Sequence, residues 1–244
     1  MIRYAENKRR HSTDTSGYSF PATENVRRVH RMIPGYQETD LRRLDDLAHQ
    51  LGVKAVFVKD ESARFGLKAF KGLGSVYAMF RILCRALGLD GQRATLEELK
   101  AYQREIGEMT FATTTDGNHG KGVSWAAALF GCKAIVYMPK GTVEVRAEAI
   151  RKAGNATVTI TDLKYDDCVA RTAKLAEENH WFLIQDTAWD GYEEIRNGLC
   201  RDIQPCCLKR RSRCKRLRRI FSFRRESGPW PGRSRRRHPR PGAK

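Results

Sequence analysis

The segment Met109–Thr–Phe–Ala–Thr–Thr–Thr–Asp–Gly–Asn–His–Gly120 decides the fold of this 244-residue chain. Its apolar start, Met109 to Thr113, predicts a short strand. The Ala-rich stretch that follows, Gly120 to Phe130, predicts a helix that ends at Gly131. A strand that enters a helix through a Gly/Asn turn is typical of an open α/β sheet, where such turns hold ligands.

The same alternation of apolar runs and helical patterns continues on both sides of this segment. Strands are expected over residues 53–59, 134–138, 156–160 and 181–185, and helices over 40–51, 72–89, 97–105, 143–153 and 165–179. The helix over 40–51 rests on regularly spaced leucines (41, 44, 47 and 51), with Asp40 as its capping candidate. Strands that alternate with helices in this way predict an α/β fold with a doubly wound, mostly parallel sheet.

A second informative segment lies upstream, Glu61–Ser–Ala–Arg–Phe–Gly–Leu–Lys–Ala–Phe–Lys–Gly–Leu–Gly74. Lys71 follows Phe70 in it and opens a predicted apolar helix. A lysine that loses its proton readily forms an imine with a carbonyl compound. By position alone, a lysine at a helix start is usually a solvated surface residue, and Lys59 and Lys68 are rivals for the same role.

In this order and spacing, the two segments resemble the pyridoxal-phosphate enzymes of the tryptophan synthase β (fold type II) family. In detail they are similar to the diaminopropionate ammonia-lyases, which share the run Thr115–Asp–Gly–Asn–His–Gly120. The resemblance implies α,β-elimination of 2,3-diaminopropionate to pyruvate and ammonia, with pyridoxal 5'-phosphate as the electron sink. It implies that Lys71 attaches the cofactor and that Asn118 and Gly117 bind it.

Two aspartates distinguish this resemblance from other fold type II enzymes. By analogy with the lyases, Asp116 serves as the base for the D-isomer and Lys71 for the L-isomer. Asp186, in Gln185–Asp–Thr–Ala–Trp189, matches the second active-site acid of the lyases, although an Asp after a strand is more often a helix cap. A threonine dehydratase or another fold type II dehydratase remains an alternative that these acids disfavour.

Other residues near the matched motifs carry weaker expectations. Ser62, Arg64 and Trp189 are expected to line the substrate pocket because they adjoin matched motifs. His119 is expected to pack or to cap the helix rather than to act in catalysis.

The charge of the chain is unevenly distributed. Residues 201–244 hold 17 of the 46 Lys and Arg but only two acids, or +15, while the first 200 residues hold 29 bases and 26 acids, or +3. We therefore predict two parts: residues 1–197 as the N-terminal portion of a lyase, comprising part of the large domain and the smaller α/β domain, and residues 198–244 as an irregular basic tail. A basic arm that binds nucleic acid through phosphates is an alternative interpretation of the tail.

The resemblance runs from about Tyr18 to Ile195 and then stops within a motif. When each last codon base is joined to the first two bases of the next codon, residues 195–203 permit the lyase continuation Pro–(Glu or Lys)–Trp–Ile–Met–Gln–Gly–Tyr. In the same frame, residues 219–233 permit a sequence like the glycine-rich phosphate loop of the family. We therefore expect that the reading frame is lost near Ile195, that the second half of the site is missing and that activity is impaired.

The remaining features bound the setting of the protein. No apolar run approaches the roughly 18 residues that span a bilayer, and the start of the chain does not resemble a secretory leader. The seven cysteines have no paired spacing that would indicate zinc or a disulfide framework. We expect a cytoplasmic enzyme with no metal and no membrane contact that acts on a small amino acid. The family resemblance implies a homodimer.

Overall fold

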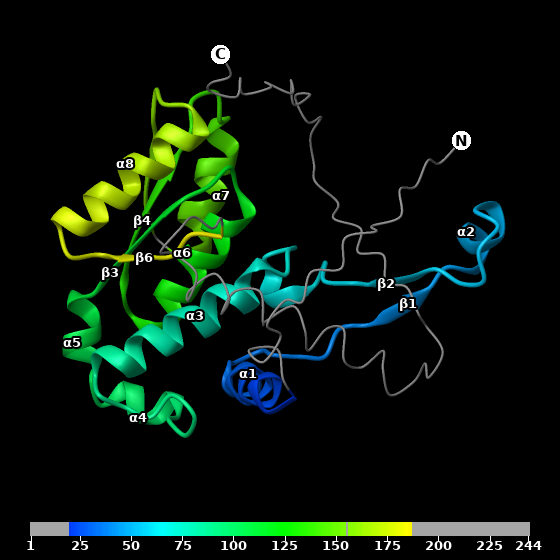
Figure 1. Ribbon diagram of the computed structural model, residues 1–244, viewed down its shortest axis with the longest axis horizontal. Coiled ribbons are helices and arrows are strands. Elements are labelled where there is room, and N and C mark those ends of the chain that lie inside the picture. Colours follow the sequence, from blue (N-terminus) through cyan, green and yellow to red (C-terminus); the bar gives the residue numbers. More distant parts are fainter. Residues whose placement is uncertain (1–19, 155, 187–244) are drawn as a thin grey trace, which may run out of the picture.

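The structure is a computed structural model, and it describes residues 20–154 and 156–186, with the side chains of 20–23 left aside. Fifteen elements follow one another in this part of the chain (Figure 1). They are α1 (Phe20–Met32), β1 (Leu41–Arg43), α2 (Asp45–Gln50), β2 (Phe57–Lys59), the 3-10 turn η2 (Arg64–Gly66), α3 (Lys71–Ala86), α4 (Leu96–Lys100), α5 (Gln103–Glu108), β3 (Thr110–Thr114), α6 (Asn118–Phe130), β4 (Lys133–Met138), α7 (Glu144–Gly154), β5 (Thr157–Ile160), α8 (Tyr165–Glu178) and β6 (Phe182–Leu183).

The main sheet has the order β5-β4-β3-β6, and all three of its pairings are parallel, as the sequence predicts. Helix α6 contacts β3 and β4, and α7 contacts β5, whereas α8 contacts β3, β4 and β6. Figure 1 shows α8 on one face of this sheet and α6 with α7 on the other. Both faces are therefore covered, which explains why β3 is buried along nearly its whole length.

One core joins these layers. Helix α3 packs against α6 and α1, and its buried Val76, Phe80 and Leu83 belong to the same cluster as Phe111 of β3 and Val136 of β4. Glycine makes the closest approach possible where α6 crosses the start of α3. A Cβ on Gly122 would lie 2.8–2.9 Å from Ser75 Oγ and from the backbone carbonyl of Lys71.

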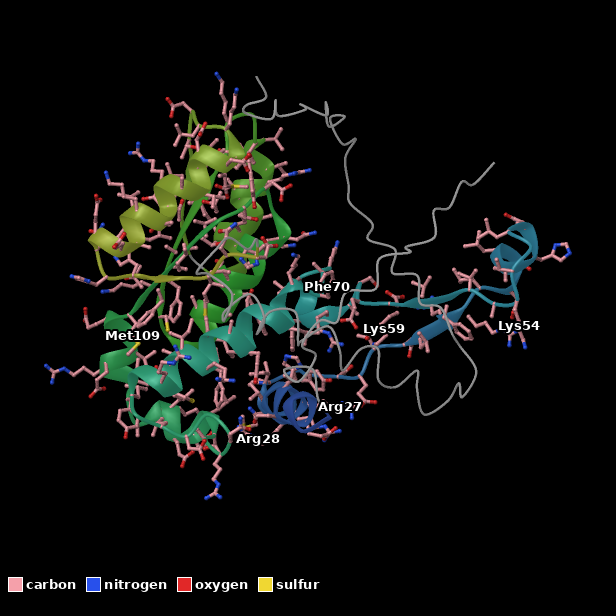
Figure 2. All side chains as sticks on the ribbon, in the orientation of Figure 1. Arg27, Arg28, Lys54, Lys59, Phe70 and Met109 are labelled. Atoms are coloured by element: carbon pink, nitrogen blue, oxygen red, sulfur yellow. The ribbon has the colours of Figure 1, made fainter. Side chains whose placement is uncertain are left out.

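A small second sheet stands apart from the main sheet and the helices packed on it, which together we call the body. Strands β1 and β2 pair antiparallel, with Leu41 opposite Lys59 and Arg43 opposite Phe57, and α2 lies at their far end (Figure 1). Figure 2 shows Lys54 near the tip of this projection and Phe70 on the body.

Several expected boundaries were wrong. The helix expected over 40–51 is a strand followed by a short helix that begins at Asp45, because the first leucine of the stripe, Leu41, enters the ladder with β2. The helix expected over 97–105 is two helices separated by residues 101–102, and α1 was not expected at all. No helix in the described residues combines the length and the apolar character that a membrane crossing requires.

Candidate active site at the sheet edge

The order of the main sheet creates a topological switch point at its carboxyl edge. From β3 the chain crosses to β4 over one face through α6, and it returns to β6, on the other side of β3, through α8 on the opposite face. The winding therefore reverses between β3 and β6. In open α/β sheets, ligands bind outside the carboxyl ends of the strands at such a switch point. The loop 115–117 leaves β3 there, and Gln185 and Asp186 follow β6 there.

Lys71 and Asp186 meet at this edge although 115 residues separate them. Lys71 Nζ lies 2.5 Å from Asp186 Oδ2, and the two side chains are 18% and 22% exposed. Lys71 is the first residue of α3, and its Nζ lies 5.7 Å from the centre of the Phe70 ring. The site therefore presents a largely buried, solvent-reachable amine in contact with a carboxylate.

Gln185 fixes the backbone next to Asp186. Its Oε1 accepts from Thr114 N (2.9 Å) and Thr113 Oγ1 (3.2 Å), and its Nε2 donates to Thr114 O (3.0 Å). The buried amide thus pairs with β3 as a strand residue would, beyond the last residue of β6. This arrangement holds Asp186 at the carboxyl end of β3.

His119 approaches the same carboxylate from the first turn of α6. Its Nε2 donates to Ile184 O at 3.0 Å, which leaves Nδ1 as an acceptor 4.0 Å from Asp186 Oδ2. Burial lowers the pKa of His119, although Asp186 acts in the opposite direction. The ring is therefore neutral. Packing was expected for His119, but its proximity to Asp186 was not.

The loop between β3 and α6 is tightly folded. Thr115 Oγ1 accepts from Gly117 N (3.0 Å) and Gly120 N (3.2 Å), and Gly117 has φ 159° and ψ −90°, a combination that suits glycine. The Asp116 carbonyl accepts from Arg146 Nη1 at 3.0 Å. Asp116 and Asn118 are exposed at this edge.

Tyr165, the first residue of α8, is a member of the site that sequence reasoning missed. Its Oη accepts from Gln185 Nε2 at 3.2 Å. Burial, together with the negative charges of Asp186 and Asp116, raises the pKa of Tyr165 to about 12. The phenol therefore keeps its proton at neutral pH. One signal was available: Tyr165 opens the helix after β5, so it lies at the same carboxyl edge of the sheet.

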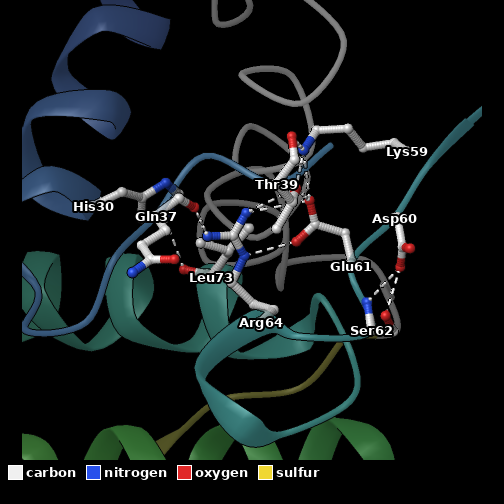
Figure 3. A network of polar contacts seen from close by, with 9 residues as sticks. All are labelled: His30, Gln37, Thr39, Lys59, Asp60, Glu61, Ser62, Arg64 and Leu73. Atoms are coloured by element: carbon white, nitrogen blue, oxygen red, sulfur yellow. Dashed lines mark hydrogen bonds and ion pairs between the residues drawn. The ribbon is translucent and has the colours of Figure 1, made fainter. Parts of the chain in front are cut away.

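The pocket residues expected upstream lie in a different environment. Arg64 is 4% exposed, and its Nε donates to Glu61 at 2.7 Å (Figure 3). Its guanidinium also lies over the Tyr36 ring. Ser62 is exposed, and both its N and its Oγ donate to Asp60. A substrate role for Arg64 and Ser62 stays a prediction, and Trp189 lies outside the described residues.

The rival lysines are placed apart from the Lys71–Asp186 pair. Lys59 donates to Thr39 O at 2.8 Å and pairs with Glu61 at 3.1 Å, in the network of Figure 3. Lys68 has a positive φ of 55° in the turn before α3. Lys71, by comparison, contacts Asp186 directly.

Comparisons with known proteins agree with this geometry. Residues 32–205 match the family described as pyridoxal-phosphate dependent enzyme. The chain is 47% identical over 195 residues to diaminopropionate ammonia-lyase of Escherichia coli K12, which covers 80% of this chain and 48% of the relative. It is 29% identical to a Salmonella typhimurium L-threonine dehydratase over 142 residues, which covers 58% of this chain and 23% of that relative.

Solved structures give the same result. The crystal structure of the apo E. coli diaminopropionate ammonia-lyase aligns with a TM-score of 0.78 and 42% identity, and covers 86% of this chain and 56% of that chain. The chain therefore spans about half the length of the relatives that it matches most extensively. The family match ends ten residues beyond Ile195, so its end does not locate a change of reading frame.

Proposed function

The chain belongs to the family of pyridoxal-phosphate-dependent enzymes, and from this premise we propose that it carries one half of the active site of a diaminopropionate ammonia-lyase. The single observation that supports the proposal is the contact between Lys71 and Asp186 at the switch point of the sheet. An amine beside a carboxylate suits an aldehyde cofactor with a flat polar ring. The glycine-containing loop 115–117, followed by Asn118, leaves β3 at the same edge of the sheet. When bound, pyridoxal phosphate supplies an electron sink that makes the Cα proton of an amino acid acidic.

Lys71 and Asp186 form the reactive end of the site. Lys71 Nζ donates a hydrogen bond to Asp186 Oδ2, and 2.5 Å separates the two atoms. Lys71 would hold pyridoxal phosphate covalently through Nζ, and once released it would serve as a base. The Gln185 amide fixes the backbone next to Asp186 through its hydrogen bonds to Thr114.

The opposite loop supplies the remaining chemistry. Asn118 would donate a hydrogen bond to the cofactor, and Gly117 would let the backbone lie close to it. Asp116 removes the Cα proton of D-2,3-diaminopropionate, and Lys71 removes that of the L-isomer. The products of elimination and hydrolysis are pyruvate and ammonia.

We propose further that residues 1–197 are the lyase portion of this chain and that residues 198–244 are read in a shifted frame. The assignment rests on the codon phase described above, and on the chain matching only about half of its relatives. It implies impaired turnover by this chain alone. It implies also that the family homodimer and a cytoplasmic location belong to the complete enzyme. Sequencing the locus tests the assignment, because it requires an intact downstream frame in the stated phase.

Cofactor titration of the purified chain tests the function. We expect a visible absorption band when pyridoxal phosphate is added, and its loss in Lys71→Ala. Lys68→Ala is the matched control, because it removes a neighbouring lysine and should leave the band unchanged. Release of the 2-oxo acid is then measured with each isomer of diaminopropionate, which gives pyruvate, and with threonine, which gives 2-oxobutyrate. A band that survives Lys71→Ala, or turnover of threonine in place of diaminopropionate, contradicts the proposal.

A further inference from the structure

The turn immediately before Lys71 has an unusual backbone conformation. Three of the four residues 65–68 have positive φ: Phe65 (49°), Gly66 (70°) and Lys68 (55°). Phe65 and Lys68 are two of the three residues other than glycine that have positive φ in the described part of the chain. A bulky side chain in the left-handed region is costly, so this conformation persists only where surrounding contacts impose it.

Lys121 holds the end of this turn that leads to Lys71. It is the fourth residue of α6, and its Nζ donates to Leu67 O at 2.7 Å. Burial, and then the charge of Lys68, lower the pKa of Lys121, which indicates that its ammonium is partly withdrawn from water. A hydrogen bond is stronger where water competes less for its donor, so this bond restrains the backbone between Leu67 and Lys71.

Two further residues of α6 contact the same segment. Trp125, one helical turn after Lys121, stacks on the ring of Phe65, with 4.4 Å between the ring centres and 23° between the ring planes. Gly122 lies so close to Lys71 that a Cβ there would come within 2.9 Å of the Lys71 carbonyl. Side chains four residues apart lie on the same face of a helix. One face of α6 therefore holds the chain from Phe65 to Lys71.

The beginning of the turn is anchored separately. Arg64 donates through Nε to Glu61 and through Nη1 to Gln37 O (Figure 3). Its guanidinium also lies 5.5 Å from the centre of the Phe65 ring. These contacts act where the chain enters the turn. Lys121 acts where the chain leaves it, next to the start of α3.

We propose that Lys121 is a positioning residue for Lys71: by holding Leu67 O, it sets where α3 begins and so places Lys71 Nζ against Asp186. The helix that carries Lys121 begins at Asn118, so the loop expected to bind the cofactor and the turn before Lys71 are held by the same element. The inference deepens the function proposed above and rests on it for the chemical role of Lys71. The contact between Lys71 and Asp186 can be tested without the cofactor.

The test is competitive reductive methylation of the full-length chain with formaldehyde and cyanoborohydride, before any cofactor is added. Isotope labelling and peptide mass spectrometry quantify each lysine relative to Lys100, whose side chain is 65% exposed. An amine that is hydrogen-bonded to a carboxylate reacts slowly, because its lone pair is not available to the aldehyde. Lys121→Met keeps the aliphatic stem but removes the donor. We expect it to raise the labelling of Lys71 about three- to tenfold, as for the loss of one hydrogen bond from a charged donor.

Three matched variants identify the cause of this increase. Lys121→Arg retains a donor and should restore the native labelling of Lys71. Lys68→Ala removes the neighbouring charge but not the bond to Leu67 O, so the labelling should stay unchanged. In an Asp186→Asn background the labelling should already be raised, and Lys121→Met should add little, because the contact that Lys121 positions is already weakened.

Four results overturn the proposal. The first is equal labelling of Lys71 in the native and Lys121→Met chains, and the second is an undiminished effect of Lys121→Met in the Asp186→Asn background. The third is an equal increase in Lys68→Ala, which identifies charge as the cause. The fourth is an equal increase at Lys59, whose side chain is 20% exposed, because it indicates that the whole chain has loosened.

A second variant and a second measurement keep the test decisive. Trp125→Leu removes the ring stack and should also raise the labelling of Lys71, and circular dichroism checks that each variant folds. Titration with pyridoxal phosphate separates the two proposals. A native chain without a cofactor band contradicts the proposed function, whereas the labelling of Lys71 still decides the role of Lys121.

Discussion

Helix α3 and residues 41–59, the arm that comprises β1, α2 and β2, are both rich in aliphatic side chains. Only α3 buries them. Eleven of the sixteen residues of α3 are buried, against one of the nineteen residues of the arm. The difference lies in what each meets: α3 packs on α6 and α1, whereas the elements of the arm chiefly contact one another. An apolar pattern thus shows that a segment needs a partner, but it does not show whether the chain supplies one.

The same contrast divides the candidate site from its surroundings. Lys71 and Asp186 lie on segments that pack into the core of α3, α6 and the main sheet, so their positions are well defined. The arm leads into the Arg64 network, close to the start of α3, and buries little of its own apolar surface. The predictions below test this division between a completed body and an uncompleted arm.

The largest difference in the free energy of unfolding should come from replacing one leucine by alanine in each region. Leu83→Ala on α3 removes a fully buried side chain, and we expect a loss of about 2–5 kcal/mol in the free energy of unfolding. Leu47→Ala on the arm removes a side chain that is 39% exposed, and we expect less than about 1 kcal/mol. Urea unfolding followed by circular dichroism measures both. Equal losses would show that the arm is packed as tightly as the body.

A pH effect should arise where the body meets the root of the arm. Burial lowers the pKa of His30 from 6.5 to about 4, while its Nε2 donates to Leu73 O at 3.1 Å and Arg64 and Glu61 lie nearby. Between these two values the unfolded chain binds more protons than the folded one, so stability falls as pH falls. The loss attributable to His30 reaches about 3 kcal/mol at the acid end of this window.

His30→Gln keeps a hydrogen-bond donor but removes the titration. The difference in unfolding free energy between the native chain and this variant should therefore depend on pH between 6.5 and 4, whereas it should be constant above that window. A difference that does not change with pH would mean that His30 is accessible to protons in the folded state.

Within the site, Gln185→Leu should cost about 1–3 kcal/mol, because it leaves the backbone N–H and C=O of Thr114 buried without their partner. The visible cofactor band should weaken in parallel, since Asp186 loses its support. Asn179→Leu removes one exposed hydrogen bond, from the Asn179 side-chain amide to Leu175 O. It is the control, with little expected effect. A stable Gln185 variant with an unchanged band would exclude a positioning role.

The smallest effect is expected from the charges of the arm. Arg43 and Asp45 are 59% and 67% exposed, and a pair this solvated contributes about 0–1 kcal/mol. Arg43→Ala should therefore leave urea unfolding almost unchanged. A large loss would mean that charge, and not apolar cover, organises the arm.

The amino-acid sequence predicted the body better than the arm for a physical reason. Parallel strands buried on both faces are continuous apolar runs, so the main sheet was recognisable residue by residue. The leucines of residues 41–51 fit a helical spacing, but pairing of Leu41 with Lys59 overrode it, and no local signal specifies such a pairing. Helix α1 does carry an apolar stripe, with Val26 and Val29 buried in the core, but the charged residues between them obscured it and it was missed.

The family resemblance named candidate site residues but not their contacts. The motifs identified Lys71, Asp116, Asn118 and Asp186 through family resemblance. The 2.5 Å contact between Lys71 and Asp186 depends on how α3 packs on α6, and the role of Tyr165 depends on the winding of the sheet. Both are properties of the topology, which spacing along the chain does not encode.

The most direct measurement is the location of covalently fixed cofactor. The chain is mixed with pyridoxal phosphate, reduced with borohydride and digested, and the modified peptide is identified by mass spectrometry. The account predicts modification at Lys71, and a marked decrease in Asp186→Asn. Modification at Lys59 or Lys68, or label distributed over exposed lysines, would contradict it.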